Sequence, residues 1–184
     1  MPITRTPRGS WIEAGLKALG DGGPEAVRIE PLAKSLGVTK GSFYWHFEDR
    51  QALLEELLDA WERTVIDDVV ERVDREGGDA KGRLRELFSL AASGVRGGLM
   101  GTELAIRDWA RHDDGVAARL RRVDNRRMDY MRSLFGELCE DEDDVEARCL
   151  LSFSLFIGSG FIAADHGGRS RAEVLAGAMR QLGI

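Results

Sequence analysis

A tight turn between two short helical segments, within residues 32–47, constrains the fold of this chain more than any other feature of its sequence. Ala33 is small enough for two helices to cross closely, and Gly37 tolerates the positive φ that a tight turn demands. Four apolar side chains can then meet beneath the turn as a small core: Leu32, Leu36, Val38 and Phe43. The pattern predicts a helix-turn-helix unit, whose first helix packs across the second.

Both predicted helices begin with residues that favour the start of a helix. Pro31 fits the first turn of the first helix, where a missing N–H costs no hydrogen bond. Thr39 is placed to cap the second helix, which leaves Lys40 and Ser42 on its first turn. Gly41 weakens so short a helix and therefore indicates that another backbone, such as a phosphate chain, approaches closely. In helix-turn-helix proteins this second helix lies in the major groove of DNA.

The run Val38–Phe47, followed by Asp49–Arg50 and Leu53–Leu54, resembles the DNA-binding signature of the TetR family of bacterial transcriptional regulators. The resemblance covers residues 10–58 at motif level, and the rest of the chain is similar to the family in size and helical pattern. It implies an all-α fold. An N-terminal three-helix helix-turn-helix head would be joined by a long helix to a C-terminal helical body that binds ligand and dimerises.

The same resemblance implies which residues of the second helix contact DNA. Thr39, Lys40 and Ser42 would lie at or near base edges. Tyr44 and His46 would contact phosphates, in keeping with the way that polar side chains fix the register of a protein on DNA.

Two arginines extend this set. Arg50 would hold a phosphate at the start of the next helix. Arg28 stands where the family more often has a small hydroxyl residue, so its contact would be longer or ionic. The predicted DNA-binding residues are Arg28, Thr39, Lys40, Gly41, Ser42, Tyr44, Trp45, His46 and Arg50.

Core packing is the alternative role for the aromatic residues of this segment. Helical spacing turns Phe43 and Phe47 inward, so packing is the favoured role for both. Phosphate contact is favoured for Tyr44 and His46, whereas Trp45 suits either role.

Charge is distributed unevenly along the chain. The 184 residues include 26 Lys or Arg and 32 Asp or Glu, whereas residues 1–50 contain seven basic and six acidic residues. An acidic body argues against a protein that coats nucleic acid and restricts DNA contact to the head. We therefore expect a DNA-binding domain over residues 1–50, with a flexible basic arm at 1–9, and an effector-binding and dimerisation domain over 51–184.

The N-terminus has no apolar signal segment, which predicts a cytoplasmic protein. Arg5 and Arg8 of the basic arm either reach DNA or belong to a disordered terminus. Cys139 and Cys149 lack other metal ligands nearby, so we expect both thiols to be reduced and Cys149 to lie in the core.

Asp108, His112 and Asp113 have spacing that metal binding allows, but no further His or Cys cluster supports such a site. The chain also contains no phosphate-binding loop and no nucleophile elbow. We therefore expect no catalytic residues, no metal, no cofactor and no enzymatic activity.

Helix signals occupy the rest of the chain. Ser10–Glu13 has the pattern of a capping box, Asp49 can cap the long helix that follows the head, and Ser170–Glu173 forms a second box. The predicted helices cover residues 10–20, 40–46, 50–76, 79–96, 102–109, 113–139, 149–164 and 171–182, with a further short helix that Glu30 would open before the turn at Gly37.

Arg127 lies on an apolar stripe of one of these helices, where a charge requires a partner. It either pairs with Asp124 or Glu103, or it points into a cavity and recognises an anionic effector. Core packing is the alternative for most of the other candidates. The predicted ligand-pocket residues are Trp61, Phe88, Trp109, Arg127, Met128, Met131, Phe135 and Phe153.

The stretch Cys149–Ala164 contains sixteen residues without a charge. It is too short and too rich in Ser and Gly to span a membrane, yet a helix that is apolar on all sides must be covered on all sides. We expect a second subunit to cover one side, with the last helix completing a four-helix interface. The predicted dimer residues are Phe156, Gly158, Ser159, Gly160, Ala163, Leu175 and Met179.

A dimer would place two heads about one helical turn apart, which suits a palindromic operator in double-stranded DNA. The sequence thus predicts a homodimeric transcriptional repressor that a small-molecule effector, not identified by the sequence, releases from DNA. The alternatives are a constitutive regulator without ligand and a helical protein-interaction module. The second alternative leaves the basic and aromatic residues of the head unexplained.

Overall fold

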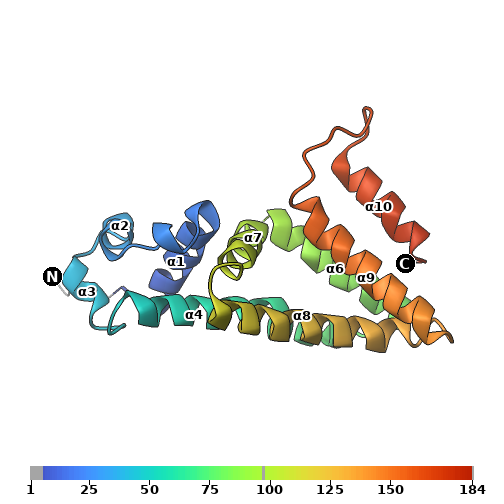
Figure 1. Cartoon of the computed structure of the whole chain (residues 1–184), viewed down its shortest axis with the longest axis horizontal. Coiled ribbons are helices and arrows are strands. Elements are labelled where there is room, and N and C mark those ends of the chain that lie inside the picture. The colour runs from blue at the N-terminus through green and yellow to red at the C-terminus, as the bar shows by residue number, and fades with distance from the viewer. Residues whose placement is uncertain (1–5, 97, 184) are drawn as a thin grey trace. The chain divides into compact units, whose positions relative to one another are not determined.

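The computed structural model describes residues 6–96 and 98–183, which form helices and turns and contain no strand (Figure 1). The predicted all-α fold is confirmed. Residues 1–5 of the predicted arm, which include Arg5, lie outside the described residues, as does Gly97 at the predicted end of one helix.

The chain divides into two compact units. Unit 1 holds residues 1–67 and 94–122, and unit 2 holds residues 68–93 and 123–184. The functional boundary at residue 50 stays a prediction.

Unit 1 contains the predicted head. Its elements are α1 (Arg8–Gly22), the 3-10 turn η1 (Pro24–Ala26), α2 (Ile29–Ser35), α3 (Lys40–Phe43), α4 (Arg50–Glu62), the π-helical turn η2 (Arg63–Asp67), α7 (Leu99–Trp109) and the first part of α8 (Asp114–Phe135). Its largest fully buried side chains are Trp11, Leu19, Phe43, Leu53, Leu54, Leu57, Leu58, Trp61 and Ile106.

Helix α1 begins two residues earlier than the predicted capping box. The chain enters the helix directly after Pro7, whose φ of −61° and ψ of 149° suit the residue that precedes a helix, and Ser10 lies inside the helix. The prediction of a cap at Ser10 is therefore wrong. The buried stripe is Trp11, Gly15 and Leu19.

Helices α1 and α7 cross with their backbones in close contact. A Cβ atom added to Gly20 would lie 3.0 Å from the backbone nitrogen of Thr102 and 3.3 Å from the carbonyl carbon of Gly101. The Thr102 hydroxyl donates a hydrogen bond of 3.2 Å to the carbonyl oxygen of Leu16. Helix α7 starts at Leu99 rather than at Thr102, because Gly98 adopts a left-handed φ of 87° and begins it there.

A buried carboxylate connects α4 with α7. The indole Nε1 of Trp61 donates to Oε2 of Glu103 at 3.2 Å, and Nη2 of Arg107 lies 2.8 Å from the other carboxylate oxygen. Glu103 is 1% exposed. These partners offset the cost of removing its charge from water.

Unit 2 contains α5 (Asp68–Glu76), most of α6 (Ala80–Arg96), the second part of α8, α9 (Glu142–Ser159) and α10 (Arg171–Gln181). Gly77 and Gly78 follow α5 with positive φ values of 68° and 96°, and Asp79 caps α6 by accepting from the Gly82 amide at 2.7 Å. The buried core consists of Leu84, Met131, Leu134, Phe135, Val145 and Cys149.

Two helix ends in unit 2 differ from the sequence predictions. Helix α8 ends at Phe135, about one turn before the predicted position, and α9 starts at Glu142 rather than at Cys149. Asp141 caps α9 by accepting from the Asp143 amide at 2.9 Å, and three acidic residues in its first turn suit the positive end of the helix dipole.

Helix α9 ends at Ser159, so the predicted continuation to Ala164 is wrong. Gly158 and Gly160 bracket this end, and glycine disfavours helix continuation. The capping box of α10 is confirmed, since Ser170 Oγ accepts from the Glu173 amide and Glu173 accepts from the Ser170 amide. Among the described residues, no helix is long and apolar enough to cross a membrane.

Both cysteines are free thiols, and Cys149 is buried as predicted. Burial raises the pKa of the Cys149 thiol to about 11. At pH 8 about one thiol in a thousand is then ionised, and reagents also lack access to it. We expect Cys149 to resist a disulfide reagent in the native protein and both cysteines to react at once in guanidinium. Rapid native labelling of Cys149, located by peptide mapping, would contradict its burial.

Candidate nucleic-acid interface

The helix-turn-helix unit forms as the sequence predicts. The turn after α2 places Gly37 at a φ of 69°, and the Val38 amide donates to the Ala33 carbonyl at 2.9 Å. Beneath the turn, Phe43 and Phe47 are buried and stacked with their ring centroids 5.2 Å apart. The rings of Trp11 and Phe43 pack edge to face, with their centroids 5.4 Å apart. This core orients α3.

Helix α3 is shorter than predicted. It covers Lys40–Phe43 and continues as a turn over residues 44–46. Thr39 occupies the predicted N-cap position, but its side chain makes no capping hydrogen bond. The second half of the segment is a turn, in which the amides of His46 and Phe47 both donate to the Phe43 carbonyl. Glycine and aromatic residues are poor helix formers, which suits so short a helix.

Most predicted DNA-binding side chains are accessible. Tyr44 is 53% exposed and Trp45 is 72% exposed, which is unusual for large aromatic residues above a packed core. The exposed members of the set are Arg28, Thr39, Lys40, Gly41, Tyr44 and Trp45, and the half-buried members are Ser42, His46 and Arg50. The Nε2 atom of His46 is shielded from solvent and has no hydrogen-bond partner among the described residues.

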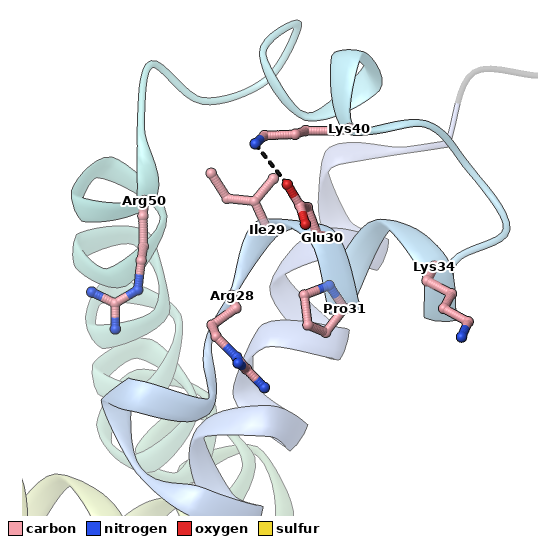
Figure 2. Close-up of a pocket in the computed structure, with 7 residues that line it drawn as sticks. All are labelled: Arg28, Ile29, Glu30, Pro31, Lys34, Lys40 and Arg50. Carbon is pink, nitrogen blue, oxygen red and sulfur yellow. Dashed lines mark hydrogen bonds and ion pairs between the residues drawn. The ribbon is translucent and has the colours of Figure 1, made fainter.

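A groove in the head brings together three predicted residues from α3, α4 and the start of α2. Figure 2 shows Arg28, Lys40 and Arg50 around it, and the remaining lining residues are Ile29, Glu30, Pro31 and Lys34. Its volume is about 670 Å³. With four cations and one carboxylate, the groove suits an anion. Lys34 and Glu30 were not predicted as part of the interface.

Arg50 has partners that sequence reasoning missed. Its Nε donates to the carbonyl oxygen of Val27 at 2.7 Å, and its Nη2 donates to the carbonyl oxygen of Pro24. Glu25 Oε1 lies 3.8 Å from the same guanidinium. Arg50 therefore fixes the connection between α1 and α2 against α4, and the phosphate contact at Arg50 stays a prediction. Its neighbour Asp49 caps α4 as predicted, accepting from the Ala52 amide at 2.8 Å.

Replacing Arg50 with lysine is expected to destabilise unit 1 by about 1–2 kcal/mol, because a single ammonium group cannot reproduce the two-pronged contact with Pro24 and Val27. Chemical denaturation followed by circular dichroism measures this change. Arg28→Lys is the matched control, since Arg28 is exposed, and it should stay within about 0.5 kcal/mol of the unsubstituted chain. Equal stability of the two variants would show that the Arg50 contacts contribute nothing.

The predicted ligand-pocket residues fall in both units. Trp61 is buried and Trp109 is half-buried in unit 1. Five others belong to the unit 2 core or pack against it: Phe88, Met128, Met131, Phe135 and Phe153.

Arg127 lies within unit 2 with its side chain 12% exposed. Its Nη1 atom is 3.4 Å from Asp124 Oδ1, and its guanidinium lies 5.7 Å from the centroid of the Phe153 ring. The predicted pairing with Asp124 is confirmed. Recognition of an anionic effector by the same guanidinium stays a prediction.

The predicted dimer residues lie on α9, on α10 and in the segment between them. Phe156, Gly158 and Ser159 are half-buried on α9, and Leu175 and Met179 are half-buried on α10. The other two predicted residues, Gly160 and Ala163, are exposed and follow the end of α9. Sequence reasoning missed the most exposed apolar side chains of this region, which are Leu150, Leu151, Phe161 and Ile162.

Asp108 and Asp113, whose spacing would allow metal binding, have other partners in the structure. Asp113 Oδ1 accepts from the Val116 amide at 3.0 Å at the start of α8, and Asp108 pairs with Arg111 at 3.9 Å. No three His, Cys, Asp or Glu side chains form a potential metal site in the described part of the chain.

Comparison with known proteins identifies the head. Residues 12–57 match the family model for bacterial regulatory proteins of the tetR family. The tetracycline repressor protein class G of Vibrio anguillarum is 36% identical over 58 residues, which cover 32% of this chain and 28% of that protein. The transcriptional regulator AcrR of Shigella flexneri is 29% identical over 77 residues, covering 42% of this chain and 36% of that protein. These matches span about a third of each relative.

Solved structures extend the likeness to the whole fold. The ketosteroid transcriptional regulator KstR2 of Mycobacterium tuberculosis superposes with a TM-score of 0.71 at 17% identity, over 97% of this chain and 94% of the other. A regulator of the TetR/AcrR family from Thermobifida fusca gives a TM-score of 0.65 at 17% identity, over 95% of each chain.

Fold and site together define a helical protein with an N-terminal helix-turn-helix domain of the kind found in bacterial regulators. The match to the TetR family covers residues 12–57 of the chain, which is its helix-turn-helix head.

Proposed function

We propose that this protein is a transcriptional regulator that binds double-stranded DNA through its head. The observation that carries this proposal is the exposure of Tyr44 and Trp45 beside Lys40, at the end of a helix that a packed aromatic core holds in place. A purely structural module has no need for large aromatic side chains in water. The protein would act in the cytoplasm and catalyse no reaction.

Within this proposal each residue has a role set by its position. Thr39, Lys40 and Ser42 lie at or near base edges, and Gly41 lets the phosphate chain approach closely. Tyr44 and His46 contact phosphates, and Trp45 contacts DNA beside them. Arg28 makes an ionic contact from the groove, and Arg50 supports the same groove. Phosphate contacts fix the register of the head, and base contacts supply specificity.

Affinity measurements with a mixed-sequence duplex test DNA binding. Tyr44→Phe combined with His46→Ala removes two proposed phosphate contacts and should weaken binding at least about tenfold. Tyr130→Phe combined with His112→Ala makes the same chemical changes outside the head and should leave binding unchanged. Equal affinities for both double variants, each shown by circular dichroism to be folded, would overturn the proposed interface.

A homodimer follows from the same function, since one short helix contacts too few base pairs to select a site in a genome. The exposed apolar side chains Leu150 and Leu151 on α9, with Phe161 and Ile162 after it, support the predicted interface. The interface would include the predicted residues Phe156, Gly158, Ser159, Gly160, Ala163, Leu175 and Met179.

The protein would act as a repressor that a small molecule releases from DNA. One relative is named a tetracycline repressor, and that name includes a small molecule. An effector that favours a DNA-incompetent form must weaken DNA binding by the same factor by which DNA weakens effector binding.

Arg127 is the proposed contact for an anionic effector. A guanidinium that binds a carboxylate contributes about 1.5–3 kcal/mol, so Arg127→Met should weaken release of DNA by an anionic effector about tenfold or more. Titration of DNA release with that effector measures the change. An unaltered response in the folded variant would remove Arg127 from the effector site and leave it the structural partner of Asp124.

A further inference from the structure

One carboxylate lies within the cationic groove of the head. Of the seven residues that line this groove, Arg28, Lys34, Lys40 and Arg50 are positive and Glu30 alone is negative. Glu30 lies on the first turn of α2, and Lys40 is the first residue of α3. The groove is therefore adjacent to the end of α3 that the proposed function places against DNA.

Glu30 and Lys40 point toward one another across this groove (Figure 2). Lys40 Nζ lies 2.9 Å from Glu30 Oε1, and the two side chains are 52% and 72% exposed. The hydrogen bond and the neighbouring charge lower the pKa of Glu30 and raise the pKa of Lys40, so both groups are ionised at neutral pH. Because both are accessible, the ammonium can exchange one partner for another without unfolding the head.

Arg50, another cation of the groove, is held differently. Arg50 donates to two backbone carbonyls, those of Val27 and Pro24, and has a structural role whether or not DNA is present. Lys40 is bound by a surface carboxylate instead. A DNA phosphate competes directly with that carboxylate for the same ammonium.

We propose that Glu30 masks Lys40, so that the free head presents one fewer effective cation to the phosphate backbone and binds DNA of arbitrary sequence more weakly. The inference rests on the proposed DNA-binding function. Glu30 thereby sets how strongly the head is attracted to phosphate before any base is contacted.

Counterion release makes this proposal measurable. Each phosphate that a free cation neutralises adds about 0.9 to the slope of log affinity against log salt concentration. In the unsubstituted chain, added salt also screens the Glu30–Lys40 pair and weakens its competition with phosphate, which offsets part of this slope. In Glu30→Gln the Lys40 charge is free beforehand, so its transfer to phosphate contributes fully to the slope.

Fluorescence anisotropy measures binding to a random-sequence duplex between about 50 and 200 mM salt, a range over which affinity for DNA changes strongly with salt concentration. Glu30→Gln should steepen the slope by up to about 0.9 and tighten binding about two- to fivefold at the lower salt. Adding Lys40→Met to Glu30→Gln should abolish the steepening, because the cation that Glu30 masks is then absent.

Glu25→Gln is the matched control. It removes the same charge from an exposed carboxylate beside a groove cation, but Arg50 keeps its two carbonyl partners. Its slope should therefore match that of the unsubstituted chain.

Two results would overturn the proposal: an unchanged slope in Glu30→Gln, or a steepening that persists in the double variant, which would mean that Glu30 simply repels DNA. Failure of the unsubstituted chain to bind any duplex would instead overturn the proposed function, and this inference with it. The two failures are therefore distinguishable.

Discussion

Replacing Trp61 with alanine is expected to destabilise unit 1 by about 3–5 kcal/mol, the cost of deleting a large side chain from a closed core. Trp61 is fully buried in α4, and its indole nitrogen donates to Glu103 on α7. The substitution therefore removes packing and one partner of a buried carboxylate together. Guanidinium denaturation followed by circular dichroism measures the loss.

Trp61→Phe separates the two contributions. It keeps an aromatic ring in the core and removes the donor to Glu103, which retains Arg107 at 2.8 Å, so the loss should be about 1–2 kcal/mol. Trp61 was also predicted to line a ligand pocket. A loss below about 1 kcal/mol for Trp61→Ala would favour that role, because a side chain facing a cavity contributes less packing.

Replacing Gly20 with alanine is expected to destabilise unit 1 by about 1–3 kcal/mol. A glycine-to-alanine change inside a helix ordinarily stabilises by about 0.5–1 kcal/mol. At Gly20 the change in the free energy of unfolding has the opposite sign, because the new methyl group would lie 3.0 Å from the backbone nitrogen of Thr102. A backbone atom cannot move away as the end of a flexible side chain can. Thermal and guanidinium unfolding give the size of the effect.

Gly9→Ala is the control on the same helix. No atom lies within 4 Å of a Cβ at Gly9, so this variant should be as stable as the unsubstituted chain or slightly more stable. If Gly20→Ala also gained stability, the close crossing of α1 and α7 would be wrong.

The head was predictable because its signals are local. Gly37 is needed for one left-handed turn, Asp49 caps the helix that follows it directly, and Phe43 turns inward through its helical position. Each of these demands is met by residues within a few positions along the chain. The capping box at Ser170 is local in the same sense and was predicted correctly.

Contacts between distant segments were not predictable from the same signals. Arg50 holds carbonyl groups 23 and 26 residues earlier, and backbone carbonyls carry no sequence signature. Gly20 and Gly101 meet only because α1 and α7 cross there. Glu103 pairs with Arg107, one turn further along α7, and sequence reasoning did not propose this pair.

Competing local signals account for the wrong helix ends. At the start of α1 the position of Pro7 prevailed over the box at Ser10, and Asp141 began α9 before its uncharged stretch. Apolar character indicated correctly that the stretch after Cys149 belongs to a helix. It did not indicate the end of that helix, which falls beside Gly160.

Selection of bound sequences from a random DNA pool tests the central claim most directly, that two heads of a dimer recognise DNA. We expect enrichment of a palindrome with half-sites about one helical turn apart, roughly 10 base pairs between their centres. The motif should be lost with Tyr44→Phe combined with His46→Ala. No enrichment at moderate salt, from protein that is folded and dimeric, would contradict the account.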